Sequence, residues 1–386
     1  MSDATARKAE LVVIGAGPAG RGLAHRAIVA GVDTVLVDRR PDRPWDDTYA
    51  AWTDELPSWV PDTVTATAVP AVAVYAPDEV QIPRGYTVLD SPGLQTHLAI
   101  PESAVVTGDV AEVSDNRVEL RDGRVLFGAT VIDARGSRNT PGPEQTAFGV
   151  FVTPERAAAV LGAHQAVLMD WRPHYRSGGP SDTGPASFLY VVPITSELVL
   201  MEETCLAAHP AVKLGVLRER LRSRLSRHGL NVDDAIEQRA VEQVDFTLTG
   251  GGPRPWRHTP MTFGAAGALM HPATGYSVAT SLSCADPVVD AIARGDDPAA
   301  ALWPQSARAV HRLRRRGLNA ALALDADETV AFFGAFFRLP PHAQRAYLSD
   351  RSDLRGVMSA MLAMVRLAER RIGLKVAHHA AAPARW

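Results

Sequence analysis

LVVIGAGPAGRGLAHRAIVAGVDTVLVD, residues 11–38, decides the fold of this 386-residue chain. Its apolar start, residues 11–14, predicts a buried strand that runs directly into glycines at positions 15, 17 and 20. The first glycine permits a tight turn, the second lets the backbone approach a pyrophosphate, and the third lets the following helix pack close to the strand. A second apolar run, residues 35–37, ends in an aspartate whose carboxylate suits ribose hydroxyls. This βαβ order predicts a dinucleotide-binding site, formed by Gly15, Ala16, Gly17, Pro18, Ala19, Gly20, Asp38 and Arg39.

Composition excludes several classes of protein. The 40 lysines and arginines are balanced by 43 acidic residues, so the net charge of −3 gives nucleic-acid binding no electrostatic support. Cys205 and Cys284 are too few to staple a chain of this size, which favours a reducing cytoplasm. The polar start MSDATARKAE resembles neither a secretory signal nor an anchor, and no run reaches the roughly 18 apolar residues of a membrane span. We therefore expect a cytoplasmic protein, free or peripheral on the cytoplasmic membrane, and predict no metal site.

A second glycine-rich passage, residues 261–293, predicts another turn between a strand and a long helix. In the fold of aromatic hydroxylases the comparable segment has an aspartate after its first glycine, where this chain has Ala265, but the spacing to Pro272 and Gly275 is kept. Two such turns converging on one long cofactor favour FAD over NAD. His271 suits either tuning of the flavin ring or a structural cap, and we favour the cap. The cofactor residues predicted here are Gly264, Gly267, His271, Pro272, Gly275 and Tyr276, with Asp133 at the end of a predicted strand, residues 130–133.

The remaining pattern predicts an interleaved α/β chain. Asp122 and Gly123 indicate a hairpin between residues 118–120 and 124–127. The expected fold is an FAD-binding Rossmann-like domain of the glutathione-reductase and hydroxylase type, interleaved with an antiparallel substrate domain and followed by a helical region. The FAD-binding domain is predicted at residues 1–45, 105–147 and 254–300, the substrate domain at 46–104 and 148–253, and the helical region at 301–386.

Two stretches leave alternatives open. Three tryptophans, Trp45, Trp52 and Trp59, suit either an aromatic anchor for a loop or the wall of an apolar pocket, with Asp54 as an available acid. A last helix over about residues 354–374 has an apolar face and several basic residues. Such a helix suits packing on its own protein, and it also suits a membrane interface.

Five motifs resemble those of the flavin-dependent lycopene cyclase family of bacteria, cyanobacteria and plants, over nearly the whole chain. These are WDDTYAAWTDEL, MDWR, FLYVVP followed by MEET, GAAGALMHPATGY and FFGAFFRL. Three positions depart from the family pattern. Leu200 and Met201 stand for a Phe-Leu pair, Ala50 stands for a glycine, and an acidic pair before the GGP turn is reduced to Glu242.

The resemblance implies conversion of lycopene ends to β-ionone rings, giving γ-carotene or β-carotene, by proton-initiated cyclisation with no net redox change. In the family the flavin works reduced and stabilises the carbocation, and NAD(P)H serves only to reduce it. Apolar residues before MEET keep a glutamic acid protonated, and strand alternation sends its two glutamates to opposite faces. We therefore predict Glu202 as the acid, Glu203 in a supporting hydrogen bond or salt bridge, and Asp54 as the final proton acceptor. The predicted pocket residues are Tyr49, Trp52, Trp171 and Tyr190.

Two other functions remain open from the residues. An FAD-dependent oxidoreductase, either a monooxygenase or an isoprenoid double-bond reductase, could use the same scaffold, although Ala265 and the MEET strand argue against a hydroxylase. A flavin- or carotenoid-binding protein without catalytic activity is the third. The cyclase is the preferred hypothesis.

Overall fold

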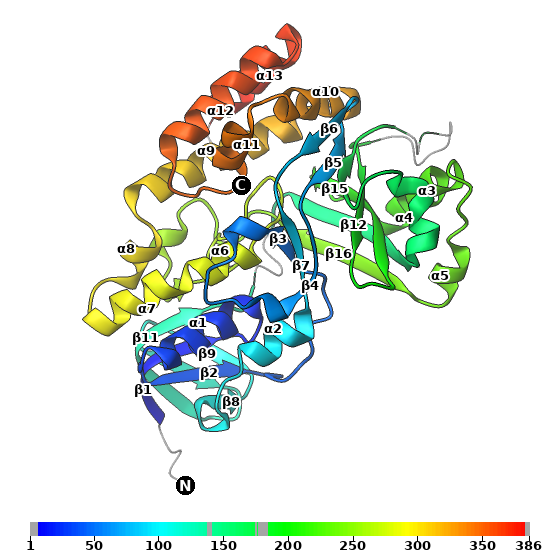
Figure 1. The fold of residues 1–386 in the computed structure, drawn as a ribbon. Helices are drawn as coiled ribbons and strands as arrows, with labels where there is room; N and C mark the ends of the chain where they lie inside the picture. Colours follow the sequence, from blue (N-terminus) through cyan, green and yellow to red (C-terminus); the bar gives the residue numbers. More distant parts are fainter. Residues whose placement is uncertain (1–6, 137–140, 174–175, 177–183, 383–386) are drawn as a thin grey trace.

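The computed structural model describes residues 7–136, 141–173, 176 and 184–382. Figure 1 shows three parts: a sheet near the N-terminus, an antiparallel sheet beside it, and a layer of helices from the C-terminal region over both. In the described part of the chain, no helix combines the length and the apolar character that crossing a bilayer requires.

The first sheet carries the glycine-rich fingerprint. Its strands follow the order β8-β2-β1-β11-β10-β9, with β17 beside β11; β1, β2, β8, β11 and β17 pair in parallel and the β9–β10–β11 meander is antiparallel. The bounds are β1 Arg7–Ile14, β2 Thr34–Asp38, β8 Val105–Thr107, β9 Val110–Val113, β10 Arg117–Leu120, β11 Val125–Asp133 and β17 Met261–Thr262. The predicted hairpin at Gly123 is present. The two strands expected at 124–127 and 130–133 are one strand, because β11 pairs with β1 along its whole length.

Helices α1 (Pro18–Val29) and α7 (Ala285–Arg294) cover one face of this sheet. Helix α1 begins with Pro18 at a position where a missing N–H costs no hydrogen bond. The long helix expected after Gly275 is divided at Cys284 into α6 (Val278–Ser283) and α7. The division allows α6 to lie against α1 and against β3 (Ala50–Trp52), while α7 packs along α1.

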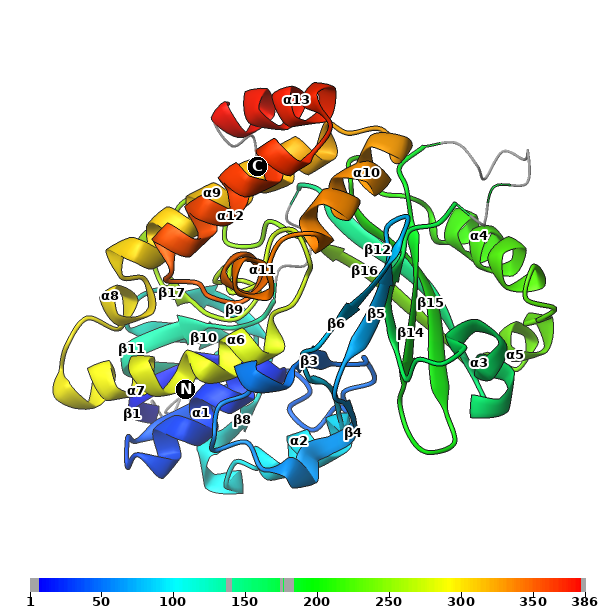
Figure 2. The same ribbon diagram turned by 45° about the horizontal axis from the view of Figure 1, so that its top comes forward.

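The second sheet, called the antiparallel sheet below, has the order β16-β12-β15-β14-β13-β5-β6; all of its pairs are antiparallel except β13 with β5, which is parallel. Its strands are β5 Val72–Tyr75, β6 Glu79–Ile82, β12 Glu144–Val152, β13 Val167–Asp170, β14 Phe188–Pro193, β15 Val199–Ala208 and β16 Val241–Thr247. Helices α3 (Pro154–Leu161), α4 (Leu214–Ser226) and α5 (Asp233–Glu237) lie on the face away from the first sheet (Figure 2). The boundary expected between residues 147 and 148 falls inside β12.

A small sheet, β3-β7-β4, connects these two parts. It comprises β3 Ala50–Trp52, β4 Thr65–Val69 and β7 Tyr86–Leu89, and α2 (Ser91–His97) follows. Short 3₁₀ turns occur at η1 Thr53–Glu55, η2 Asp62–Val64, η3 Glu102–Ala104 and η5 Pro255–Arg257.

The C-terminal region is helical, as expected. Its helices are α8 Pro298–Leu302, α9 Gln305–Leu322, α10 Ala326–Phe337, α11 Pro341–Leu348, α12 Leu354–Leu367 and α13 Arg370–Ala381. The single last helix predicted from the sequence is wrong, because extended backbone at Ala368 separates α12 from α13. This break lets α13 pack along α9 and bury Ile372 and Val376.

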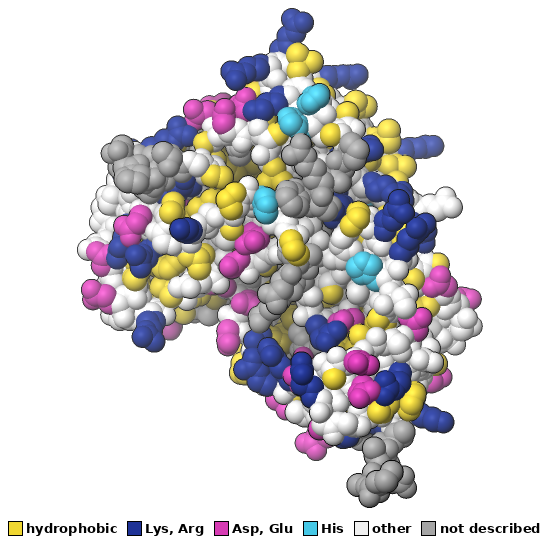
Figure 3. All heavy atoms as spheres, turned by 180° about the vertical axis from the view of Figure 1, so that it is seen from behind, with side chains coloured by type: hydrophobic (Ala, Val, Ile, Leu, Met, Phe, Trp, Pro, Cys, Tyr) yellow, Lys and Arg dark blue, Asp and Glu magenta, His cyan; other side chains and the backbone are white. Residues whose placement is uncertain are grey.

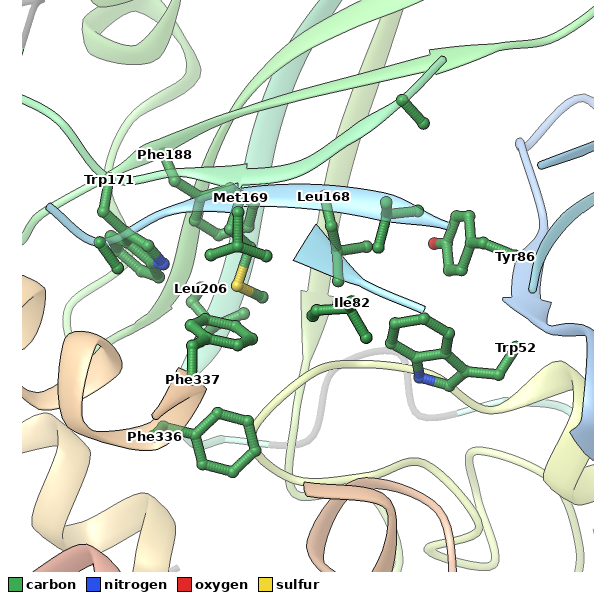
Figure 4. Close-up of a cluster of buried hydrophobic side chains, with 14 of the residues drawn as sticks. Trp52, Ile82, Tyr86, Leu168, Met169, Trp171, Phe188, Leu206, Phe336 and Phe337 are labelled. Atoms are coloured by element: carbon green, nitrogen blue, oxygen red, sulfur yellow. The ribbon is translucent and has the colours of Figure 1, made fainter. Parts of the chain in front are cut away.

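Helix α10 closes one side of the antiparallel sheet. A side chain at Gly334 would meet the Ala76 carbonyl oxygen at 2.4 Å, so the helix backbone lies directly against the end of β5. Phe336 and Phe337 then enter a buried cluster with Met169 and Leu206 (Figure 4). This cluster forms the core between the helical layer and the sheet.

Candidate active site

A cavity of about 1190 Å³ lies between the first sheet and the antiparallel sheet. Gly15, Gly17 and Glu202 all line this large cavity. Sites for drug-sized ligands usually measure about 300–1,000 Å³, so this cavity has room for a dinucleotide and part of a second ligand.

The three fingerprint glycines have different surroundings. Gly15 adopts φ +105°, and a Cβ there would lie 2.8 Å from the Ala134 carbonyl oxygen. A Cβ on Gly20 would lie 2.0 Å from the Gly15 oxygen, whereas one on Gly17 would meet open space. Asp38 also lines the cavity, and its Oδ2 accepts a hydrogen bond from Ala16 N at 3.0 Å. The open space at Gly17, beside the start of α1, fits a pyrophosphate.

The second glycine-rich turn lines the same cavity through Ala265, Gly275 and Tyr276. A Cβ on Gly264 would lie 2.5 Å from that of Ala19, so the two turns are in close contact. One on Gly267 would meet the Thr262 oxygen at 2.5 Å, so this glycine is required by packing. The predicted convergence of the two turns is therefore present, and it fits one long cofactor such as FAD.

Six predicted cofactor residues do not line the large cavity: Gly20, Asp133, Gly264, Gly267, His271 and Pro272. His271 Nε2 lies 3.1 Å from the Tyr347 carbonyl oxygen, and its Nδ1 accepts a hydrogen bond from Ala273 N. Burial holds the pKa of His271 well below its usual value, so the ring is neutral and closes the turn that also contains Pro272. Asp133 pairs with Arg135, which does line the cavity.

Successive side chains of β15 point alternately to the cavity and to the hydrophobic core on the other face of the sheet. Leu200, Glu202, Thr204 and Leu206 line the cavity, whereas Val199, Met201 and Cys205 face the core beneath α4. Glu202 is 8% exposed and accepts a 2.6 Å hydrogen bond from the Thr204 hydroxyl. Burial, with a smaller contribution from the Glu242 carboxylate, raises the pKa of Glu202 to about 8. Its carboxyl is therefore protonated at neutral pH.

Glu203 lies on the opposite face of β15. Its side chain is completely buried, and its two oxygens lie 2.7 and 3.0 Å from the Nε and one terminal nitrogen of Arg224 on α4. The Ser187 hydroxyl donates a further hydrogen bond of 2.6 Å. This bidentate pair fastens α4 to the sheet, away from the cavity.

Glu242, to which the sequence pattern assigns no role, lines the cavity. On β16 it stands opposite Gly149 of β12, and Glu202 of β15 stands opposite the same glycine. Its Oε1 accepts a hydrogen bond from Thr48 N at 2.8 Å. The one feature of the sequence that could have indicated Glu242 is its place in the family's acidic motif before the GGP turn.

Tyrosine side chains join Glu202 to the second glycine-rich turn. Tyr190 lies directly opposite Glu202 across β14 and β15. The Tyr86 hydroxyl lies 3.1 Å from that of Tyr190 and 2.7 Å from that of Tyr276. All three tyrosines, with Tyr49, line the cavity. Tyr86 was not among the predicted pocket residues, and nothing in its local sequence distinguishes it from other strand residues.

A family profile described as "Lycopene cyclase protein" matches residues 10–372. The chain belongs to the lycopene cyclase family. Its relatives include "Lycopene beta cyclase, chloroplastic" of Arabidopsis thaliana, 28% identical over 382 residues that cover 89% of this chain and 74% of that protein. An "Uncharacterized carotenoid cyclase" of Deinococcus radiodurans is 30% identical over 399 residues, covering 97% of this chain and 94% of its own. These matches confirm the resemblance drawn from the motifs.

The fold is also that of flavoproteins. The crystal structure of a flavoprotein/dehydrogenase from Cytophaga hutchinsonii matches with a TM-score of 0.56 at 13% identity, covering 96% of this chain and 99% of that one. This similarity confirms the expected α/β class with its Rossmann-like domain and antiparallel sheet.

Three of the predicted catalytic and pocket residues, Trp52, Trp171 and Asp54, lie outside the cavity lining. Trp52 packs edge-on against Tyr86, with ring centroids 5.3 Å apart, and Trp171 stacks on Phe333 at 4.5 Å. Both indoles belong to the buried core in Figure 4. Asp54, in η1, forms ion pairs with Arg84 and Arg345. The structure does not bring these three side chains to Glu202.

Proposed function

We propose that this chain closes rings at the ends of lycopene, or a related acyclic carotenoid, by proton addition with no net redox change. The observation that carries the proposal is the buried, protonated Glu202 in the same cavity as the two glycine-rich turns. Membership of the lycopene cyclase family supports the substrate class.

Glu202 is suited to protonate a carbon–carbon double bond. An alkene is a very weak base, so its proton donor must be neutral, aligned and shielded from water. Leu200 and Leu206 are buried and line the cavity on the same face of β15 as Glu202, which gives the carboxyl an apolar surrounding. The Thr204 hydroxyl donates a hydrogen bond to Oε1 of Glu202 and so fixes the orientation of the carboxyl group.

Aromatic faces are available for the positive charge that proton addition creates. Tyr190 and Tyr49 line the cavity, and a ring face attracts a cation by about 0.5–2 kcal/mol. Gly15, Gly17, Asp38, Arg39 and the second turn would hold FAD, as their open space and donors fit it. Bound in its reduced form, FAD would place negative charge near the developing cation.

The test is expression in a lycopene-accumulating host, with pigments separated and identified. We expect cyclic carotenoids from the parent chain, and a loss of at least roughly 100-fold in Glu202→Gln, the usual range for removing a general acid. Glu112→Gln, an exposed strand residue on β9, is the matched control. Unchanged cyclisation in Glu202→Gln would contradict its role as the acid. Consumption of NAD(P)H in step with product would instead indicate an oxidoreductase.

We also infer that α12 meets the membrane that holds the carotenoid. Met358 and Leu362 on this helix are 48% and 57% exposed, and Arg355 and Arg366 are exposed beside them. Figure 3, the view from behind, shows basic, acidic and hydrophobic side chains together at the helical end of the molecule. Exposed apolar side chains among cations suit a surface of anionic lipid.

A further inference from the structure

We propose that Glu242 receives the proton that the closing ring loses, so that Glu202 and Glu242 act as an acid–base pair. This inference rests on the proposed cyclisation. It assigns a role to a residue at which the chain departs from its family's acidic motif, and it replaces the exposed Asp54 as the acceptor.

Sheet register places the two glutamates on one face of the antiparallel sheet, on either side of β12. Gly149 of β12 pairs with Glu202 on one side and with Glu242 on the other. Residues directly opposite in an antiparallel pair point to the same face, and two strand spacings separate the outer Cα atoms by about 10 Å. A Cβ on Gly149 would meet the Leu200 Cδ1 at 2.7 Å and the Glu202 Cβ at 3.3 Å. The glycine therefore lets the Leu200 and Glu202 side chains pack closely over β12, and both Glu202 and Glu242 line the cavity.

Glu242 has one oxygen held and one free. Oε1 accepts from Thr48 N at 2.8 Å, whereas Oε2 is buried without a hydrogen-bond partner among the described residues. A buried acceptor without a donor is costly, so its position on the cavity wall indicates a ligand or solvent proton donor. The groups that act on Glu242 electrostatically are Asp47 and Glu202, with Tyr49 and Tyr190 nearby.

The different charges of Glu202 and Glu242 suit one of them to donate a proton and the other to accept one. Burial raises the pKa of Glu242, which makes its carboxylate a stronger base, and its charge in turn raises the pKa of Glu202. Like charges at one site favour a single proton shared between two carboxyls. Glu202 then carries that proton and Glu242 carries the negative charge.

The step balances in atoms and electrons. The Glu202 proton forms a C–H bond at the terminal double bond, and the neighbouring double bond attacks the cation to form the ring C–C bond. A C–H bond next to the new cation breaks, its electron pair forms the ring double bond, and its proton passes to Glu242. One proton then returns from Glu242 to Glu202 between turnovers, and no oxidant or reductant is consumed.

The experiment compares the parent, Glu242→Gln, Glu242→Asp and the control Glu112→Gln, each purified with FAD and assayed on lycopene in lipid vesicles with NADPH. We expect Glu242→Gln to lose roughly 100-fold or more in rate, the range for a general base, and Glu242→Asp to retain more activity. Residual product should contain more rings with the double bond at another position, since a different acceptor removes a different proton. The alkaline limb of the residual pH–rate profile should move to lower pH, because the charge that favours protonated Glu202 is gone.

The outcomes separate the two proposals. No cyclisation by the parent overturns the proposed function and this inference with it. Parent activity with Glu242→Gln equal to Glu112→Gln overturns the inference alone. Equal losses in Glu242→Gln and Glu242→Asp, with unchanged ring isomers and pH limb, would assign Glu242 a structural role and also overturn it. Thermal unfolding of each variant checks folding, and Glu242→Asp carries the test if Glu242→Gln does not fold.

Discussion

Glu202 and Glu203 are chemically identical neighbours in different environments. Glu202 has a hydroxyl donor, and among the described residues no cation raises its acidity, so burial dominates and the neutral acid is favoured. Glu203 is equally buried, but the guanidinium of Arg224 compensates its charge. The difference arises from the one-residue offset along β15, which turns one carboxyl to the cavity and the other to α4.

At the scale of the residue, we predict the pH dependence of activity. Only protonated Glu202 can donate, and its pKa is about 8. Below that pH this requirement is satisfied, and above it the rate should fall about tenfold per pH unit. Initial rates of ring formation across this range, with the flavin kept reduced, measure the limb. A rate that rises through pH 8 would contradict the assignment of Glu202 as the acid.

At the scale of the element, the glycines of one turn serve different ends. Gly20 is required by the fold, because any side chain there would strike the Gly15 carbonyl oxygen. Gly17, the residue before α1, has φ −72° and ψ 177°, which any residue can adopt. Its side-chain position is open to the cavity. The turn therefore contains one glycine for packing and one for ligand access.

We therefore predict opposite behaviour for Gly17→Ala and Gly20→Ala. Gly17→Ala should unfold thermally like the parent without cofactor but bind FAD more weakly, on the order of tenfold for a penalty of about 1.4 kcal/mol. Gly20→Ala should lose thermal stability even without FAD. Thermal unfolding and titration with FAD followed by flavin fluorescence measure both. Equal FAD affinity in Gly17→Ala and the parent would contradict the placement of the pyrophosphate.

At the scale of the whole molecule, the helical layer both closes the core and exposes an apolar strip. Val357, Ala360 and Met364 of α12 are buried, whereas Met358 and Leu362 are exposed. Packing on the protein itself and contact with a membrane interface, the two alternatives suggested by the sequence, are thus compatible with one helix. Packing occupies one face and leaves the other available to lipid.

We predict that a Met358→Ser, Leu362→Ser double variant binds anionic vesicles less well than the parent. Each of these side chains contributes up to about 1.5–3 kcal/mol when fully buried, so partial insertion corresponds to a loss on the order of tenfold. Vesicle sedimentation measures binding. Val29→Ser is the control, because Val29 is 61% exposed on α1, outside the helical layer. Equal binding by the double variant and Val29→Ser would contradict contact through α12.

The sequence by itself determined the features that depend on neighbouring residues. The βαβ fingerprint, the hairpin at Gly123 and the alternation of Glu202 and Glu203 each follow from local backbone geometry, and the motifs were sufficient to identify the family. The helix break at Cys284 is marked in the sequence by Pro287, which lacks an N–H and falls in the first turn of α7. The break at Ala368 was not predictable, because packing on α9 sets it and no proline or glycine stands at that position.

Only the tertiary structure decided which side chains share the cavity. Trp52, Trp171 and Asp54 have residue types that suit a carotenoid pocket. However, the two tryptophans pack in the hydrophobic core, and Asp54 forms ion pairs with two arginines. Glu242 lies 40 positions after Glu202, and strand pairing through Gly149 brings them to the same face. Such register depends on contacts between distant segments, which local sequence patterns do not encode.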